Sequence, residues 1–149
     1  MTAEERSARE AIKSRLSKYT HLARERRQLE AELERLERYK GSLKSQNLDG
    51  MPRGSTGSDP TAREAVDNVD LAAEYTERLL AIAQEQVRLE QLIEPLSATE
   101  RTLMRYRYTM GLRWEEVCEE MSYSWRQTHR IHSMALSQLA AREMKGEET

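Results

Sequence analysis

Apolar residues recur at intervals of three and four positions from about Thr2 to Leu43, a pattern typical of one face of a long α-helix. The face is interrupted where Arg26 and Lys40 fall on it. A helix of this length without an internal cap predicts a partner helix packed as in a coiled coil. The apolar positions on this face include Ile12, Leu16, Tyr19, Leu29, Leu33, Leu36 and Leu43.

The same spacing returns from about Thr61 to Glu94, which predicts a second helix with Pro60 in its first turn. The segment between them, residues 44–60, is rich in Gly, Pro, Ser and Asp and is expected to be a connecting loop. Its glycines lack the spacing of a phosphate-binding loop. Residues 1–96 are therefore predicted to form a long antiparallel helical hairpin.

Pro95 ends this pattern, and three shorter helices are expected after it. The run 97–100 (Ser-Ala-Thr-Glu) has the form of a capping box, and the helix it begins is predicted to stop at Gly111. Residues 114–121 form the next helix, and a polar turn leads to a last helix from Ser124 to about Met144. We therefore predict an all-α fold, with a helix-turn-helix unit at 97–145 and a frayed tail at 146–149.

Charge is unevenly distributed, although the formal net charge of the 149 residues is only −2. Residues 1–43 hold 11 basic and 8 acidic side chains (+3), and residues 61–96 hold 3 basic and 8 acidic (−5). These opposite balances favour pairing of the two long helices with each other. Residues 97–145 hold 8 basic and 6 acidic side chains (+2), so this unit alone is expected to bind nucleic acid weakly.

Several classes of function are disfavoured by composition. Cys118 is the only cysteine, so an internal disulfide is impossible, and Cys118, His129 and His132 lack a fourth ligand for zinc. No apolar run approaches the roughly 20 residues of a membrane span. The glutamates of 115–120 have no evident pocket in which to act as catalytic acids. We therefore expect a cytoplasmic protein without membrane, metal, cofactor or enzymatic activity.

The last helix is predicted to be a DNA-reading helix. Its apolar face, with Thr128, Ile131, Ala135 and Leu139, is expected to pack on the preceding helices. The opposite side concentrates cationic and amide groups in the first two turns, where arginine can bond guanine and glutamine can bond adenine. The candidate DNA-binding residues are Arg113, Ser124, Trp125, Arg126, Gln127, His129, Arg130 and Ser133.

Residues 97–142 resemble region 4 of sigma-70-type factors. The resemblance rests on Glu-Arg-Thr-Leu-Met-Arg-Tyr-Arg-Tyr at 100–108, Gly-Leu-Arg-Trp-Glu-Glu-Val at 111–117 and the Ser-capped helix from 124. The whole layout is similar to small phage and prophage late-gene regulators of the RinA/ArpU type. This resemblance implies a helix-turn-helix regulator that acts at promoters in a bacterial host.

The resemblance has departures. Arg113 occupies a cap position where the family usually has Ser or Thr, and Ser122 stands where a turn glycine is common. Sigma region 2 has no counterpart, so a complete sigma factor is not expected. Double-stranded DNA is the expected partner, while the hairpin is expected either to form a homo-oligomer or to bind another protein such as RNA polymerase. A phage DNA-packaging protein of the small terminase type and an RNA-polymerase-binding adaptor remain alternatives.

Overall fold

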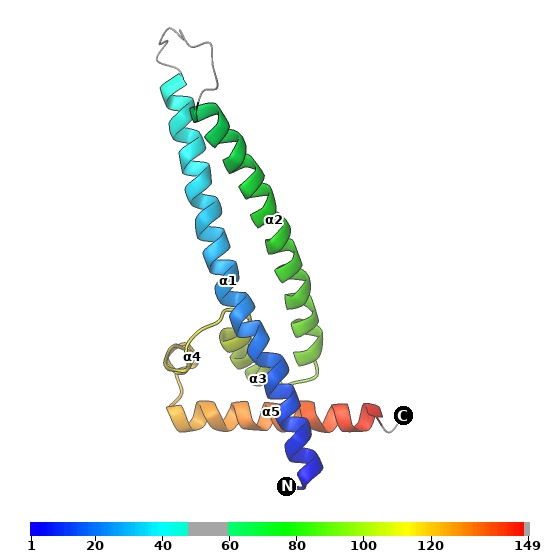
Figure 1. Cartoon of the computed structure of the whole chain (residues 1–149). Helices are drawn as coiled ribbons and strands as arrows, with labels where there is room; N and C mark the ends of the chain where they lie inside the picture. Colours follow the sequence, from blue (N-terminus) through cyan, green and yellow to red (C-terminus); the bar gives the residue numbers. More distant parts are fainter. Residues whose placement is uncertain (48–59, 148–149) are drawn as a thin grey trace. The chain divides into compact units, whose positions relative to one another are not determined.

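A computed structural model describes the backbone of residues 1–47 and 60–147, and the side chains of 1–40 and 62–146. Within these ranges the chain is helical and contains no strand, which confirms the predicted all-α class (Figure 1). In chain order the elements are α1 (Ala3–Asn47), α2 (Pro60–Ile93), α3 (Ala98–Met104), the π-helical segment η1 (Arg105–Thr109), α4 (Trp114–Met121) and α5 (Trp125–Glu147).

The helix ends differ from the predicted ones at two places. The predicted loop start at Lys44 is wrong, because α1 continues to Asn47. Residues 44–47 contain neither Gly nor Pro, so nothing local stops the helix there. α5 continues to Glu147, past the expected start of the tail at residue 146. The remainder of the expected connector, 48–59, lies outside the described residues.

The chain forms two compact units, and the boundary between them falls within both long helices. Unit 1 contains Met1–Glu25 and Ile82–Thr149, and unit 2 contains Arg26–Ala81. This division differs from the boundary expected at residue 96. The reason is that the first half of α1 and the end of α2 share a core with the helices that follow.

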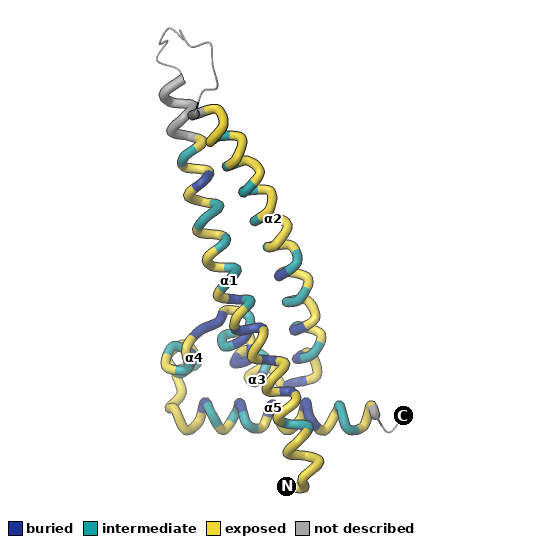
Figure 2. The backbone as a smooth tube through the Cα atoms, in the orientation of Figure 1, coloured by how far each residue is buried: buried dark blue, intermediate teal, exposed yellow. Residues whose placement is uncertain are grey.

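Unit 1 is held by one hydrophobic cluster to which every one of its helices contributes. α1 and α2 contribute their predicted apolar faces to this cluster. α3, α4 and α5 contribute the sides that are turned away from solvent (Figure 2). Each fully buried Leu or Ile stabilises such a core by roughly 1.5–3 kcal/mol. Its buried members include Ile12, Leu16, Tyr19, Leu89, Ile93, Leu103, Met104, Tyr108, Val117, Ala135, Leu136 and Leu139.

Ion pairs add to this core at the surface of unit 1. Lys18 of α1 lies 3.3 Å from Glu85 of α2. Arg105 donates to both carboxylate oxygens of Glu90 at 2.8 Å, and this bond holds the pKa of Glu90 below its usual value. Because the cation of each pair is solvent-exposed, the contribution of these pairs is small beside that of apolar burial.

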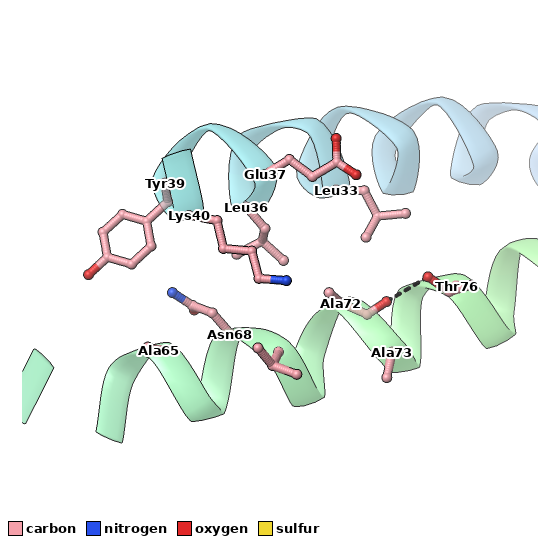
Figure 3. A pocket seen from close by; sticks show the side chains of 11 residues that line it. Leu33, Leu36, Glu37, Tyr39, Lys40, Ala65, Asn68, Ala72, Ala73 and Thr76 are labelled. Atoms are coloured by element: carbon pink, nitrogen blue, oxygen red, sulfur yellow. Dashed lines mark hydrogen bonds between the residues drawn. The ribbon is translucent and has the colours of Figure 1, made fainter. Parts of the chain in front are cut away.

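Unit 2 is less tightly packed than unit 1. Residues of α1 and α2 line a cavity of about 300 Å³, and Leu36 is the one buried hydrophobic side chain among the described residues of this unit (Figure 3). Throughout the described part of the chain, no helix combines the length and the apolar character needed to cross a membrane.

Candidate nucleic-acid interface

The helix that supports the candidate interface begins at Ser97, as predicted. The amide of Glu100 donates to the Ser97 hydroxyl at 3.3 Å, and this hydroxyl donates to the Glu100 carboxylate at 2.7 Å. The carboxylate therefore accepts from the serine side chain rather than from the backbone N–H of the expected capping box. Gln138 of α5 also donates to Glu100, at 3.3 Å, and so links the start of α3 to α5.

The path from α3 to α4 requires a glycine at position 111. The regular helix ends at Met104, earlier than predicted, and a π-helical turn follows over Arg105–Thr109. Gly111 has a φ of +69°, which is strained for residues with a side chain. A Cβ there would also lie 3.0 Å from the Cβ of Ala23 in α1. This close approach brings α1 against the loop that leads into α4.

α4 begins without the usual side-chain acceptor. Arg113 has no acceptor atom, and instead its backbone N–H and its Nε both donate to the Glu116 carboxylate, at 3.4 and 2.8 Å. The guanidinium is exposed, and Glu116 is its partner in the protein. A solvent-exposed pair of this kind is weak, so a phosphate can compete for the guanidinium.

The turn between α4 and α5 is closed by two backbone hydrogen bonds. Ser122 donates to Glu119 and Tyr123 donates to Cys118, both at 3.1 Å. This is the Schellman arrangement, in which the residue after the helix adopts a left-handed conformation. Ser122 does so, with φ 59° and ψ 37°. Ser122 therefore has the backbone geometry that favours glycine.

Replacing Ser122 with Gly is expected to raise the free energy of unfolding by about 0.5–1 kcal/mol, because glycine avoids the steric cost of a left-handed residue. Urea unfolding followed by tryptophan fluorescence measures the change. Ser137→Gly, at an exposed position within α5, is the control and should destabilise. A loss of stability in both variants would contradict the interpretation.

Most residues in the first two turns of α5 are exposed (Figure 2). The amide of Gln127 donates to the Ser124 hydroxyl at 3.1 Å, which confirms Ser124 as the cap. Trp125 is 53% exposed, and Arg126, Gln127 and Arg130 are also exposed. Among the described residues, none pairs with the guanidinium of Arg126 or Arg130. Both cations are therefore available to an external ligand.

The opposite face of α5 is buried as predicted. Thr128 and Ala135 are fully buried, Leu139 is almost so, and Ile131 is half-buried against the same core. Val117 of α4 and Leu103 of α3 belong to that core. This burial fixes the rotation of α5 about its axis, and with it the direction in which the exposed side chains point.

A stack of aromatic rings, which the sequence did not predict, joins the exposed start of α5 to the core. The Trp125 and His129 ring centroids are 4.2 Å apart, those of His129 and Trp114 4.5 Å, and those of Trp114 and His132 4.6 Å. His132 Nε2 forms a 2.7 Å hydrogen bond with the hydroxyl of Tyr108. The stack holds Trp125 and His129 in defined positions at the surface.

A cation covers one side of this stack. The guanidinium of Arg107 lies 4.9 Å from the centre of the Trp114 ring and donates to the carbonyl of Leu112 at 2.8 Å. Such a cation–π contact is favourable, most of all when it is partly desolvated. Arg107 thus supports the base of the α5 surface from η1.

Burial keeps the rings of His129 and His132 neutral near pH 7. It lowers the pKa of His132 to about 3, with a further contribution from His129 and nearby lysine and arginine side chains. It likewise raises the pKa of Tyr108 to about 12 and, together with Arg107, lowers the pKa of His129. Neither histidine lies in a group of three His, Cys, Asp or Glu side chains arranged for a metal ion within the described residues.

The polar face of α5 is divided between solvent and α1. Arg9 of α1 donates to the hydroxyl of Ser133, which is half-buried, and approaches Ser137 at 3.5 Å. The predicted site residues therefore separate into an exposed group and a half-buried group. The exposed group is Arg113, Ser124, Trp125, Arg126, Gln127 and Arg130, and the half-buried group is His129 and Ser133.

The surface at the start of α5 combines a helix N-terminus with two unpaired guanidinium groups and an exposed amide side chain. Backbone amides at a helix start attract anions, and the guanidinium and carboxamide groups match base edges. Comparisons with protein-family models, curated proteins and solved structures gave no match to this chain.

Proposed function

We propose that the protein is a sequence-specific DNA-binding transcription regulator, and that α4 and α5 form its helix-turn-helix. The exposed, unpaired side chains of Arg126 and Arg130 in the first two turns of α5 carry this proposal. A helix with its apolar side fixed in a core can enter the major groove with these side chains foremost. The arginines would bond guanine or phosphate, and Gln127 would bond adenine.

The neighbouring residues have supporting roles in this proposal. The amides of the helix start, ordered by Ser124, would hold a backbone phosphate. Trp125 would lie against the sugar-phosphate backbone, in the position fixed by its stacking on His129. Arg113 would exchange Glu116 for a phosphate. Ser133 would contribute least, because Arg9 already bonds its hydroxyl.

The resemblance to sigma region 4 and to phage regulators supports action at a promoter, and the proposal therefore includes a phage or prophage origin and a bacterial host cell. The long helices would form a hairpin that joins two copies or binds RNA polymerase. Because residues 97–145 carry a charge of only +2, from 8 basic and 6 acidic side chains, avidity from two linked copies would compensate for weak binding by one.

Selection of bound sequences from random DNA at a fixed salt concentration is expected to yield a defined site. Changing Arg126 and Arg130 together to Ala should then weaken binding about 10- to 100-fold, because each arginine contributes to base or phosphate recognition. If both contact phosphates, the slope of log Kd against log salt should fall by about 2. Fluorescence anisotropy at several salt concentrations measures both quantities.

Arg142→Ala is the matched control, because Arg142 is an exposed arginine near the other end of α5. It should leave the affinity within about twofold of the unaltered protein. If the double variant binds its site with unchanged affinity and salt slope, the proposed recognition role of α5 is wrong. Rings detected by light scattering would instead favour a DNA-packaging protein.

A further inference from the structure

In unit 2, α2 exposes apolar side chains along one face. Val66 is 60% exposed, Val69 49% and Leu80 63%, although each is large enough to favour burial. Together with three smaller residues they recur at spacings of three and four positions. We call this face the α2 stripe, and its members are Ala62, Val66, Val69, Ala73, Thr76 and Leu80.

The α2 stripe has the seven-residue period of a coiled-coil seam. Val66, Ala73 and Leu80 are separated by seven residues, as are Ala62, Val69 and Thr76, so the two sets occupy the a and d positions of a heptad repeat. A strict repeat of seven keeps one face against another helix over several turns. The stripe is therefore suited to an elongated helical partner.

Within unit 2, α1 leaves the α2 stripe open to solvent: Val69, Ala73 and Thr76 are exposed, although they also line the cavity between α1 and α2. Leu33 and Leu36 point from α1 toward α2, and between the helices lies the cavity of about 300 Å³ (Figure 3). The wall that α2 contributes includes Ala65, Ala72 and Ala73, whose side chains are too short to fill it. A hollow of this size forfeits dispersion contacts that an additional side chain would restore.

We propose that the α2 stripe binds the same stripe of a second copy of this chain, antiparallel and about a twofold axis. In the register that places Val69 against the partner's Ala73, Val66 faces the partner's Thr76 and Leu80 faces the partner's Ala62. The Val69–Ala73 and Leu80–Ala62 layers each join a large side chain to a small one, which permits close packing. The surface is self-complementary, as a twofold interface requires.

The same register places a side chain over the hollow part of unit 2. Val69, Ala72, Ala73 and Thr76 have the i, i+3, i+4, i+7 spacing of a coiled-coil hole, and all four line the cavity. The partner's Val69 is the side chain that would enter this hole. A parallel, in-register pair would instead set Leu80 against the partner's Leu80 and Ala62 against the partner's Ala62, which leaves the layers unequal in size.

Charge complementarity supports the antiparallel register. Arg63 lies beside the stripe at the position that faces the partner's Glu77, and twofold symmetry forms this pair twice. Neither Arg63 nor Glu77 is ion-paired within the described residues. Asp70 faces the partner's Asp70 near the axis, and this pair is repulsive. The dimer therefore contains two attractive charge pairs and one repulsive pair.

The dimer would supply the second copy that the proposed function uses for avidity, but its formation does not depend on DNA binding. Self-association is measured without DNA, whereas binding by α5 is measured on one site. Failure of either proposal therefore leaves the other intact.

Two single-cysteine variants of the full-length chain, Ala62→Cys and Leu80→Cys, both with Cys118→Ala, test the orientation. The antiparallel register brings residue 62 of one copy beside residue 80 of the other. A short bismaleimide should therefore give covalent dimers when the two variants are mixed, and essentially none with either variant alone. Dimers from each variant alone, or a monomer in sedimentation with no cross-linking, would overturn the proposal.

Two further changes test the stripe and the register. Val69→Glu should weaken self-association at least tenfold in sedimentation equilibrium while circular dichroism still shows a helical chain, and the control Gln84→Glu, one turn beyond the stripe, should not. Glu77→Arg should weaken the dimer, and adding Arg63→Glu should restore it. If the reversed pair does not restore association, the proposed register is wrong.

Discussion

Replacing Leu16 with Ala is expected to lower the free energy of unfolding of unit 1 by about 3 kcal/mol, the usual cost of removing a fully buried leucine side chain. Leu16 is completely buried in the cluster that also contains Ile93 and Leu139. A residue near the start of the chain therefore stabilises the helices near its end. The change tests whether the first half of α1 is part of the core that supports α5.

Tryptophan fluorescence during urea unfolding measures this loss, because both tryptophans of the chain, Trp114 and Trp125, lie in unit 1. Val87→Ala is the control: it removes an apolar side chain that is 57% exposed on α2 and should change stability by less than about 0.5 kcal/mol. If the tryptophan transition is the same in Leu16→Ala and in the unaltered chain, α1 does not belong to this core.

Acid is expected to destabilise unit 1 through His132. Its pKa is about 3 in the folded chain against 6.5 for an ordinary histidine, so the unfolded chain takes up the proton first as pH falls. The stabilisation is complete above pH 6.5 and is lost progressively toward pH 3. One proton corresponds to about 1.4 kcal/mol per pH unit, which predicts a loss of about 2 kcal/mol between pH 6.5 and pH 5.

Urea unfolding at pH 7.5 and pH 5.0 measures this dependence. His132→Gln keeps a hydrogen-bonding group near Tyr108 but cannot be protonated, so most of the pH dependence should disappear. His21→Gln removes an exposed histidine of α1 and should leave the pH dependence as it is. An equal loss of stability with acid in His132→Gln and in the unaltered chain would show that another group is responsible.

Helix starts were predictable because their signals are local. Ser97 and Ser124 each accept a hydrogen bond from an amide three residues ahead, so the pattern of residues is enough to find them. Pro60 begins α2 for the same kind of reason. The end of α1 was predicted too early, because residues 44–47 lie beside a glycine-rich segment but are themselves compatible with helix.

The candidate surface was predictable only in part. The helical period of α5 predicted burial of Thr128 and exposure of Arg126 and Arg130, since a helix wheel separates the faces. The wheel gave no sign that Arg9 would bond Ser133, because these residues belong to helices at opposite ends of the sequence. The placement of His129 between two indole rings was also not predictable, because it depends on how α4 packs on α5.

The division of unit 1 into Met1–Glu25 and Ile82–Thr149 constrains how the protein is made. On the ribosome, Ile12 and Leu16 emerge before the α5 side chains of their common core are synthesised. Until then α1 has an uncovered apolar face, of the kind that chaperones bind and proteases attack. Folding of this unit is therefore completed only after α5 has left the ribosome, and a product that stops before α5 should be degraded in the cell.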